Sequence, residues 1–549
     1  MSGWRIRCAA LVVIALAGAQ ARAELPGRED HGDLIVLHLQ GSYQEMGRQQ
    51  ADLLGPVLRR VYQIQLADFE RGLARAGAAA SWLDWLLFPL WSWIGPHYEE
   101  SGFHDEINGL AAGLGVAPAD LLRALFALAG GSTVFAATRA ATADGEALIG
   151  RNVDWADGMG ARRPLVLDVH PTNGDLAHLF VGWPLVGLPA VGLNEAGFAL
   201  SLNFFVADPQ VGLLLPQWPH RRALQRAHDV AEGIEIFQQA RLRGIAGFIA
   251  MADASGEIAL LECLPAGCSV FRPDSDWFAQ ANHARTPEMI PHDRYRSPDS
   301  FERREGMERA VAPHLRRLTP QLAARILRDR SQARWANEST VGNLQVLNAA
   351  VVHPASRTLW HSTAMQPHAA FGAYLPLRIG AGAAGAPAIP ADPWLGSPAA
   401  AAESAASLDA RRAIRHSDQG QLAEARAIWD RLARTQGPLD PTRIAWERAL
   451  VRWRTGEILA AYQALAPLEA ADAAFDARAH GLFARGVLAD ALGRRAEALR
   501  LYALAQAHLD THPEYTFFDA LRARIAEGRA GPLDVGSLPT EEHWMNLWW

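Results

Sequence analysis

Residues 130–155, GGSTVFAATRAATADGEALIGRNVDW, place Ser132 after two glycines and put Arg151 and Asp154 a short way behind it. If the chain cut itself between Gly131 and Ser132, Ser132 would become a new N-terminus. It would then carry a hydroxyl nucleophile and its own base, because the pKa of a freed α-amine is ~8, against ~10.4 for a lysine. Such a pairing is one recognised way to activate a weak hydroxyl. Taken alone, a serine after two glycines is usually part of a turn, and a self-processing chain is the alternative that this stretch offers.

The composition is that of a multidomain globular protein. The chain has 549 residues, so two or three domains are expected. Half of the residues are hydrophobic and a fifth are charged, which argues against wholesale disorder. The net charge is -7 and no basic stripe occurs, so a nucleic-acid partner is not expected. The sequence contains no Walker loop, no His-Glu-x-x-His motif and no zinc-ligand spacing, and neither a cofactor nor a metal is expected.

Residues 1–23 have the pattern of a signal peptide. Two arginines precede an apolar run from Cys8 to Ala19, and Ala21-Arg22-Ala23 is a small-x-small cleavage site. The mature chain is expected to begin at Glu24 and to be periplasmic or secreted. The apolar run is too short to span a bilayer, so the mature chain is expected to have no transmembrane span.

Cys263 and Cys268 flank Leu-Pro-Ala-Gly in ALLECLPAGCSVF, which is typical of two strands joined by a four-residue turn. The two cysteines would face each other across the ladder, at a separation compatible with a disulfide. An oxidising compartment favours that bridge. The alternative is a pair of buried thiols that act as small hydrophobic side chains.

Residues 24–131 show the periodicity of helices, for example in the apolar spacing after Ser42. Within them, residues 82–94, WLDWLLFPLWSWI, are dense in tryptophan. This segment is either a helix packed into the core, an apolar wall beside an acyl pocket, or a face that touches a membrane.

Residues 132–380 change mostly to the alternation of strands, interrupted by helical stretches at His220–Leu242 and Ser300–Leu327. Clusters of strands with helices between the clusters indicate a layered α+β domain rather than alternating βαβ units. The strand-like runs are Leu165–Val169, Leu179–Gly182, Phe198–Phe205, Gly247–Ala252, Ile258–Cys263 and Leu344–Val352.

Residues 381–405 are almost wholly Ala, Gly, Pro and Ser and are interpreted as a linker. In residues 406–535, Gly420, Gly456 and Gly493 recur at spacings of 36 and 37, each followed by an Ala-containing helical pattern. Each glycine is expected to form the turn between paired helices, in a period similar to that of tetratricopeptide repeats (TPR). Such repeats build concave binding surfaces, so a protein partner is expected there. Residues 536–549 form a tail that caps the last repeat or docks elsewhere.

Three further segments join residues 130–155 in a fixed order: VGLNEAGFALSLNFF at 191–205, WFAQANHARTPE at 277–288 and SFERREGMER at 300–309. Together they resemble the N-terminal-nucleophile (Ntn) hydrolases related to acyl-CoA:6-aminopenicillanic acid acyltransferase, the C45-type peptidase family. Choloylglycine hydrolases and acid ceramidase are more distant relatives. The resemblance covers roughly residues 35–380. The usual nucleophile of the family is cysteine, and Ser132 stands in its place.

The resemblance implies an αββα sandwich and an amide hydrolase or acyltransferase that acts on a small N-acylated amine. Ser132 would be the nucleophile, released by cleavage after Gly131. Asp154 would hold the freed amine, and Arg151 would fix Asp154 or polarise the nucleophile. Because Arg151 and Asp154 lie three apart, they are expected to converge on one pocket across a strand and turn. As plain structural residues, the two would form an ion pair.

The resemblance also implies that Asn203 and Asn282 are oxyanion donors, a contact worth ~2.7–4 kcal/mol of barrier, and that Arg303 completes the charge network. On structure alone, Asn203 would bond neighbouring backbone and His283 would be a packing residue. Asn194 is expected in a tight turn, with Gly197 supplying a positive φ.

Three hypotheses follow. The first is an exported, self-processing amide hydrolase or acyltransferase with Ser132 as its nucleophile. The second is a catalytically retired Ntn-fold protein whose repeats bind a partner. The third is an uncleaved serine hydrolase that uses His283 as its base.

Overall fold

The computed structural model describes residues 25–538 except 77–101, 126–130, 155–162, 184, 205–206, 208–216, 241–246, 295, 332–339, 384–385, 436 and 471–472. The predicted signal peptide, the tryptophan-rich segment 82–94 and nearly all of the predicted tail therefore lie outside the described residues.

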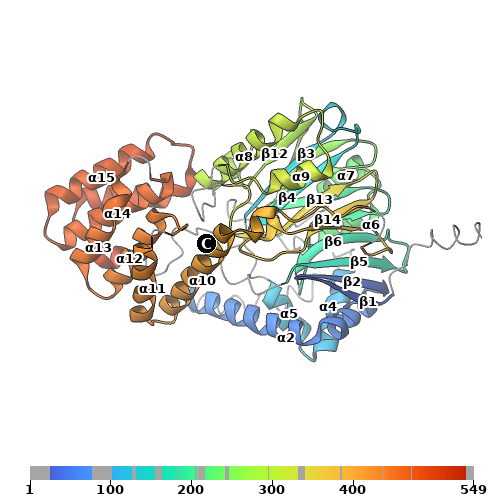
Figure 1. The fold of residues 1–549 in the computed structure, drawn as a ribbon, viewed down its shortest axis with the longest axis horizontal. Helices are drawn as coiled ribbons and strands as arrows, with labels where there is room; N and C mark the ends of the chain where they lie inside the picture. Colours follow the sequence, from blue (N-terminus) through green and yellow to red (C-terminus); the bar gives the residue numbers. More distant parts are fainter. Residues whose placement is uncertain are drawn as a thin grey trace, which may run out of the picture.

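Two stacked sheets form the larger part of the described chain (Figure 1). The first holds β1 (Gly27–His31), β2 (Leu34–Gly41), β5 (Leu165–Pro171), β6 (His178–Trp183), β7 (Val186–Asn194), β8 (Ala199–Phe204), β9 (Gly247–Ala252), β10 (Ile258–Leu264) and β11 (Gly267–Phe271), in that order. The second has the order β12 (Trp277–Gln280), β3 (Gly131–Ala137), β4 (Leu148–Asp154), β13 (Val346–His353), β14 (Thr358–Ser362) and β15 (Tyr374–Leu377). The neighbours are antiparallel, except that β2 and β5 run parallel.

Helices cover both outer faces of the sheet pair (Figure 1). Over the first sheet lie α2 (Tyr43–Ala76), α4 (Phe103–Leu114), α5 (Pro118–Leu125), α6 (Gln217–Arg226) and α7 (Val230–Gln239). Over the second lie α8 (Pro298–Val311) and α9 (Pro320–Leu327). The four layers confirm the expected α+β sandwich.

The side chains of β3 show how one strand serves two cores. Val134 and Ala136 pack between the sheets, whereas Phe135 and Ala137 pack under α8 and α9. Successive side chains of a strand point to opposite faces, and both faces of this strand are covered. Every residue of β3 is therefore buried, including Ser132.

The helical pattern expected from residue 24 onward is wrong at its start, because the strands β1 and β2 lie within Gly27–Gly41. The segment LIVLHL of β2 is buried on both faces, with Leu34 and Val36 between the sheets and Ile35 and Leu37 under the helices. A strand covered on both sides carries an apolar run without alternation, which periodicity alone does not distinguish from a buried helix.

Both expected helical stretches of the 132–380 region are broken in two. His220–Leu242 contains α6 and α7, and Asp229 begins the second helix by accepting a hydrogen bond from the Glu232 amide. Thr319 begins α9 in the same way through the Leu322 amide. In each case an N-cap residue starts the second helix.

The C-terminal part is all helical: α10 (Pro398–Asp418), α11 (Leu422–Arg434), α12 (Pro441–Arg454), α13 (Ile458–Ala464), α14 (Phe475–Ala491), α15 (Arg495–Leu509) and α16 (Asp519–Ala530). Gly420, Gly456 and Gly493 lie in the turns within three successive helix pairs, with φ of 74°, 80° and 73°. That left-handed backbone favours glycine, which confirms the placing of the turns.

The predicted linker 381–405 is only partly a linker. Helix α10 begins at Pro398, where the Ser397 side chain accepts from the Ala400 amide, and Ile389 exchanges backbone hydrogen bonds with Tyr374. The alanines of this segment are strong helix formers. The Ala-, Gly-, Pro- and Ser-rich composition that predicted a linker therefore did not reveal that a helix begins within it.

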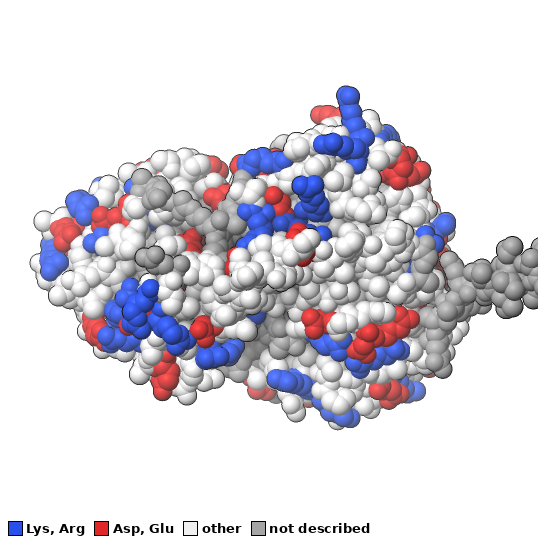
Figure 2. Space-filling model, in the orientation of Figure 1, with Lys and Arg blue, Asp and Glu red and all other residues white. Residues whose placement is uncertain are grey.

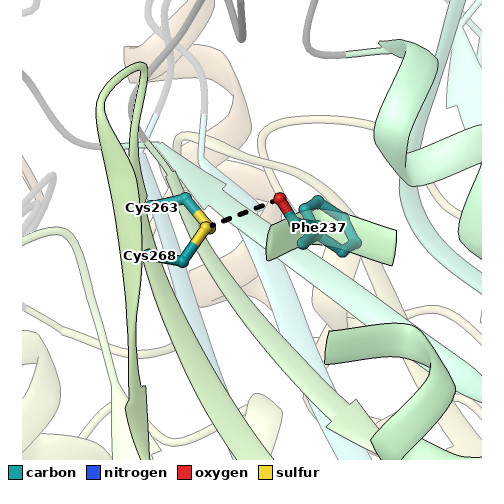
Figure 3. Close-up of a disulfide and its surroundings, with 3 residues drawn as sticks. All are labelled: Phe237, Cys263 and Cys268. Atoms are coloured by element: carbon teal, nitrogen blue, oxygen red, sulfur yellow. Dashed lines mark hydrogen bonds between the residues drawn. A yellow bond between two sulfur atoms is a disulfide. The ribbon is translucent and has the colours of Figure 1, made fainter. Parts of the chain in front are cut away.

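Cys263 and Cys268 form a disulfide across the β10–β11 hairpin, which Figure 3 shows with the Cys268 sulfur 3.9 Å from the Phe237 carbonyl oxygen. Leu264 pairs with Gly267, so the connecting turn is two residues long and not four.

We expect the Cys263→Ser/Cys268→Ser double variant to lose about 2 kcal/mol of unfolding free energy, since the bridge closes a short loop in the unfolded chain. Urea unfolding of the oxidised protein and the variant measures it. The hairpin lies at the edge of the first sheet, so the variant should keep whatever activity the protein has. A loss of activity together with unchanged stability would contradict this.

Acidic and basic side chains are interspersed over the drawn face of the molecule (Figure 2). Among the described residues, no helix is both long and apolar enough to cross a membrane. That same part of the chain holds no group of three or more His, Cys, Asp or Glu side chains arranged to bind a metal.

Candidate active site

Ser132 is the second residue of β3, and it is only 1% exposed. Its hydroxyl accepts a hydrogen bond from Arg151 Nη2 at 2.9 Å and donates to the Gly131 carbonyl oxygen at 2.6 Å. In the strand register, Ser132 is opposite Val153 and Arg151 is opposite Val134. The two side chains are therefore diagonal neighbours on one face of the sheet. The hydroxyl lies directly against the peptide bond whose cleavage was predicted.

The backbone nitrogen of Ser132 is held by a side chain as well. It donates to Asn282 Oδ1 at 2.8 Å. Asn282 follows β12, the neighbour of β3. Its side-chain nitrogen Nδ2 donates to the Phe204 carbonyl oxygen at 2.5 Å. The nitrogen that would become the α-amine is thus bound by Asn282, where Asp154 was expected.

Arg303 connects most of the site from the α8 side. Nη1 donates to the Ser132 carbonyl oxygen at 2.7 Å, to Thr133 Oγ1 at 3.0 Å and to Asp154 Oδ2 at 3.3 Å. Nη2 donates to Asn282 Oδ1 at 3.0 Å and to Asp299 Oδ2 at 2.9 Å. The guanidinium is 1% exposed, and its planar fork suits this set of acceptors.

Asp154 and Arg151 do not converge as expected. Both belong to β4 with no turn between them, and side chains three apart on a strand point to opposite faces. Arg151 therefore contacts the Ser132 hydroxyl, whereas Asp154 accepts from Arg303 and from Asn343 Nδ2 at 3.1 Å. Burial raises the pKa of Asp154 to about 6, against the opposing effects of Arg303 and Asn343.

Arg151 is a buried cation with spare donors. Within the described part of the chain, Nη2 has a hydrogen-bond partner but Nε and Nη1 have none, although the residue is only 2% exposed. Burial lowers the pKa of Arg151 to about 9, partly offset by Asp154. Unpaired N–H groups beside a nucleophile are suited to an oxygen that becomes negative during the reaction.

Asn203 reaches the site from β8 of the other sheet. Its Nδ2 donates to the Ala281 carbonyl at 2.9 Å and lies 3.4 Å from the carbonyl oxygens of Ser132 and Gln280. The side-chain amides of Asn203 and Asn282 are both engaged by backbone carbonyls. An oxyanion role for either asparagine stays a prediction. In that role, the side-chain nitrogen would have to give up its bond to the backbone carbonyl and donate to the substrate oxygen instead.

His283 is placed away from the reacting atoms. Its Nδ1 lies 2.7 Å from Ser300 Oγ, and its ring stacks on Phe301 with centroids 3.8 Å apart. Burial and four nearby arginines lower its pKa well below the ordinary value. Asn194 lies in the expected turn, where Gly197 has φ 91° and the Asn194 side chain bonds the Leu224 and Ala227 carbonyls.

The structure thus brings all six predicted site residues into one buried network, and it adds three that the sequence analysis missed. Asp299 lies one helical turn before Arg303, a spacing that is typical of a helix ion pair and was a usable signal. Thr133 is adjacent to the nucleophile. No local pattern marks Asn343, which reaches Asp154 from a loop distant in sequence.

Part of the chain that carries this site is similar to a known family. Residues 141–366 match the family model described as acyl-coenzyme A:6-aminopenicillanic acid acyl-transferase. This region is therefore similar in sequence to that family. The match spans less than half of the chain and begins downstream of Ser132. Among curated proteins, none matches the chain.

Several solved structures are similar to part of the chain. The Caenorhabditis elegans ortholog of N-acylethanolamine-hydrolyzing acid amidase has 13% identity and a TM-score of 0.31, covering 41% of this chain and 93% of that one. The penicillin V acylase from Agrobacterium tumefaciens has 11% identity and a TM-score of 0.30, covering 45% and 90%. A mutant of the conjugated bile acid hydrolase from Clostridium perfringens has 12% identity and a TM-score of 0.31, covering 42% and 88%. These scores are low, and the fold assignment rests on the sheets and helices described above.

Proposed function

We propose that the protein is an exported, self-processing amide hydrolase or acyltransferase that acts on an N-acylated amine through Ser132. The proposal rests on the hydrogen bonds of Ser132. Its hydroxyl, its backbone nitrogen and its carbonyl oxygen are each bound by a different buried side chain. A serine in an ordinary strand needs none of these contacts. The hydroxyl also lies against the Gly131 carbonyl.

Maturation would be an acyl shift followed by hydrolysis. Ser132 Oγ attacks the Gly131 carbonyl carbon, the Gly131–Ser132 C–N bond breaks, and the nitrogen takes up the hydroxyl proton. Water then hydrolyses the ester, which leaves a carboxylate on Gly131 and restores the hydroxyl. The spare Arg151 donors lie on the same face of the sheet as this hydroxyl and would stabilise negative charge on oxygen.

In turnover, the hydroxyl would attack the carbonyl of an acylated amine while the α-amine accepts its proton. The amine then protonates the leaving nitrogen, and the acyl ester passes to water or to an acceptor amine. Asn282 and Arg303 would hold the new terminus, since they already bind the Ser132 nitrogen and carbonyl oxygen. Serine is a weaker nucleophile than the family's cysteine, so this site relies more on such positioning.

The contacts across the cut support two chains that stay associated. On the N-terminal side, β2 pairs with β5 over seven residues. Glu106 and the fully buried Arg221 form an ion pair, and Tyr43 donates to Asp175 at 2.8 Å. Each contact joins residues before Gly131 to residues after Ser132. The disulfide, together with the signal-peptide pattern, supports export to an oxidising compartment.

The test is the covalent state of the purified protein. We expect N-terminal sequencing and intact mass to give two chains, one beginning near Glu24 and the other beginning Ser-Thr-Val-Phe. A panel of N-acylated amines would then be screened for release of the free amine. A single chain without hydrolysis would contradict the proposal and would favour a scaffold in which the TPR-like helices bind a partner.

Self-processing is expected to speed up as the pH rises through about 6, the pKa of Asp154 in the uncut chain. The ionised carboxylate pairs with Arg303, which positions Ser132 and Asn282. Precursor made by cell-free synthesis can be followed on denaturing gels from pH 4.5 to 8. Asp154→Asn should remove this pH dependence. If the processing rate of that variant rises with pH as it does in the wild type, Asp154 is not the origin of the dependence.

The raised pKa of Asp154 has the opposite effect on folding stability, which falls rather than rises as the pH increases through about 6. The pKa of Asp154 is higher in the folded protein than its ordinary value of 3.8, so folding favours the protonated form. This contribution to stability is fully present below pH ~3.8 and is lost as the pH rises through about 6.

A further inference from the structure

The all-helical region contacts the α8 side of the site directly (Figure 1). The Arg296 amide donates to Thr516 Oγ1 at 3.1 Å, and Thr516 Oγ1 donates to the Asp293 carbonyl oxygen at 3.1 Å. Arg296 Nε also donates to the Glu514 carbonyl oxygen at 3.2 Å. These bonds join the turn before α16 to the segment that leads into α8.

Phe301 lies at the centre of this contact. It is in the first turn of α8 but packs against the core of the helical region, with its ring 5.3 Å from that of Tyr515. On its other side it stacks on His283, and the Arg296 guanidinium lies 5.0 Å from its centroid. One aromatic ring thus separates the helical region from the residue next to Asn282.

The same turn of α8 holds the site. Ser300 Oγ accepts a hydrogen bond from the backbone N–H of Asn282 at 2.8 Å and lies 2.7 Å from His283 Nδ1. Arg296 Nη1 donates to the Ala284 carbonyl at 3.0 Å. Residues 282–284 are therefore bound by a segment that is itself packed against the helical region, and Arg303 projects from the next turn of the same helix.

We propose that the helical region is a positioning element of the active centre, acting through Tyr515 and Thr516 on Phe301 and Arg296 to hold Asn282 and Arg303 against Ser132. This inference rests on the proposed function, because its consequence is the rate of a reaction at Ser132. Tyr515 and Thr516 touch no reacting atom and are positioning residues. Displacement of a catalytic group by about 1 Å is enough to cost two orders of magnitude in rate.

The test compares Tyr515→Ala with Tyr515→Phe in the full-length chain. Removing the ring should slow self-processing roughly tenfold, as a small displacement of Asn282 and Arg303 would, and should speed amide hydrogen exchange over residues 281–284. The phenylalanine variant keeps the ring contact and should restore both. Thr516→Val provides a second variant in case Tyr515→Ala does not fold, since it removes two hydrogen bonds with little change in volume.

Tyr462→Ala is the matched control. Tyr462 is a buried tyrosine of the helical region that bonds Glu497, away from α8. It should lower the melting temperature without changing the processing rate. The inference is overturned if Tyr462→Ala slows processing as much as Tyr515→Ala, or if wild type and Tyr515→Ala are cut equally fast. A wild-type chain that stays uncut instead refutes the proposed function and, with it, a positioning role in that reaction.

Discussion

Ser132→Ala is expected to leave a single chain and to lower amide hydrolysis by a factor on the order of 10⁶, as removal of a nucleophile does in serine hydrolases. The methyl group has no lone pair to attack the Gly131 carbonyl, so the cut cannot be made. The Arg151 donors would lose the oxygen they now bind. Denaturing gels, intact mass and release of the free amine from an N-acylated substrate measure both effects.

Ser132→Cys is the matched control for this variant. A thiol keeps a nucleophile at the same atom position and is the stronger of the two at neutral pH. The cysteine chain should therefore still be cut after Gly131. An alanine variant that is cut, or that hydrolyses the substrate at the wild-type rate, would remove Ser132 from the mechanism. It would then direct attention to a different nucleophile.

Arg303→Ala is expected to cost roughly 3–5 kcal/mol of unfolding free energy, because it leaves a buried carboxylate without its cation. Asp154 would keep only Asn343 among the partners described here. Self-processing should also fail, since the Ser132 carbonyl and Asn282 lose the guanidinium that aligns them. Urea unfolding and a processing time course measure the two effects separately.

Arg309, further along the same helix, supplies the control. Arg309 pairs with Glu305 at 3.6 Å and its side chain is 53% exposed, and exposed ion pairs contribute only ~0–1 kcal/mol. Arg309→Ala should therefore change neither stability nor processing measurably. Arg303→Lys should recover part of the stability but little of the processing, because an ammonium cannot reproduce the planar fork. Equal effects at 303 and 309 would contradict the assignment of the network to Arg303.

Much of the layered fold was predictable from local patterns. The strands β9 and β10 begin at the predicted residues, Gly247 and Ile258, because alternation of apolar side chains is a local property. The turns at Gly420, Gly456 and Gly493 were likewise predictable, since they repeat a glycine at a fixed spacing. The strand β2 was missed because its second buried face comes from helices elsewhere in the chain.

The site residues were predictable as a set but not in their contacts. Motif order identified six residues that do lie together, whereas strand geometry separates Arg151 from Asp154 onto opposite faces of β4. The binding of the Ser132 nitrogen by Asn282 joins residues 150 positions apart. No periodicity encodes a contact over that distance.

By itself, then, the sequence determined the candidate nucleophile, the order of the motifs, the cysteine pair and the helix pairs, because each depends on residues that are close along the chain. Only the tertiary structure decided which partner each site residue binds and that the helical region packs on Phe301 beside the site. These contacts come from burial between layers that are distant in sequence. In such places, steric fit and the requirement to pair buried polar groups select the partner.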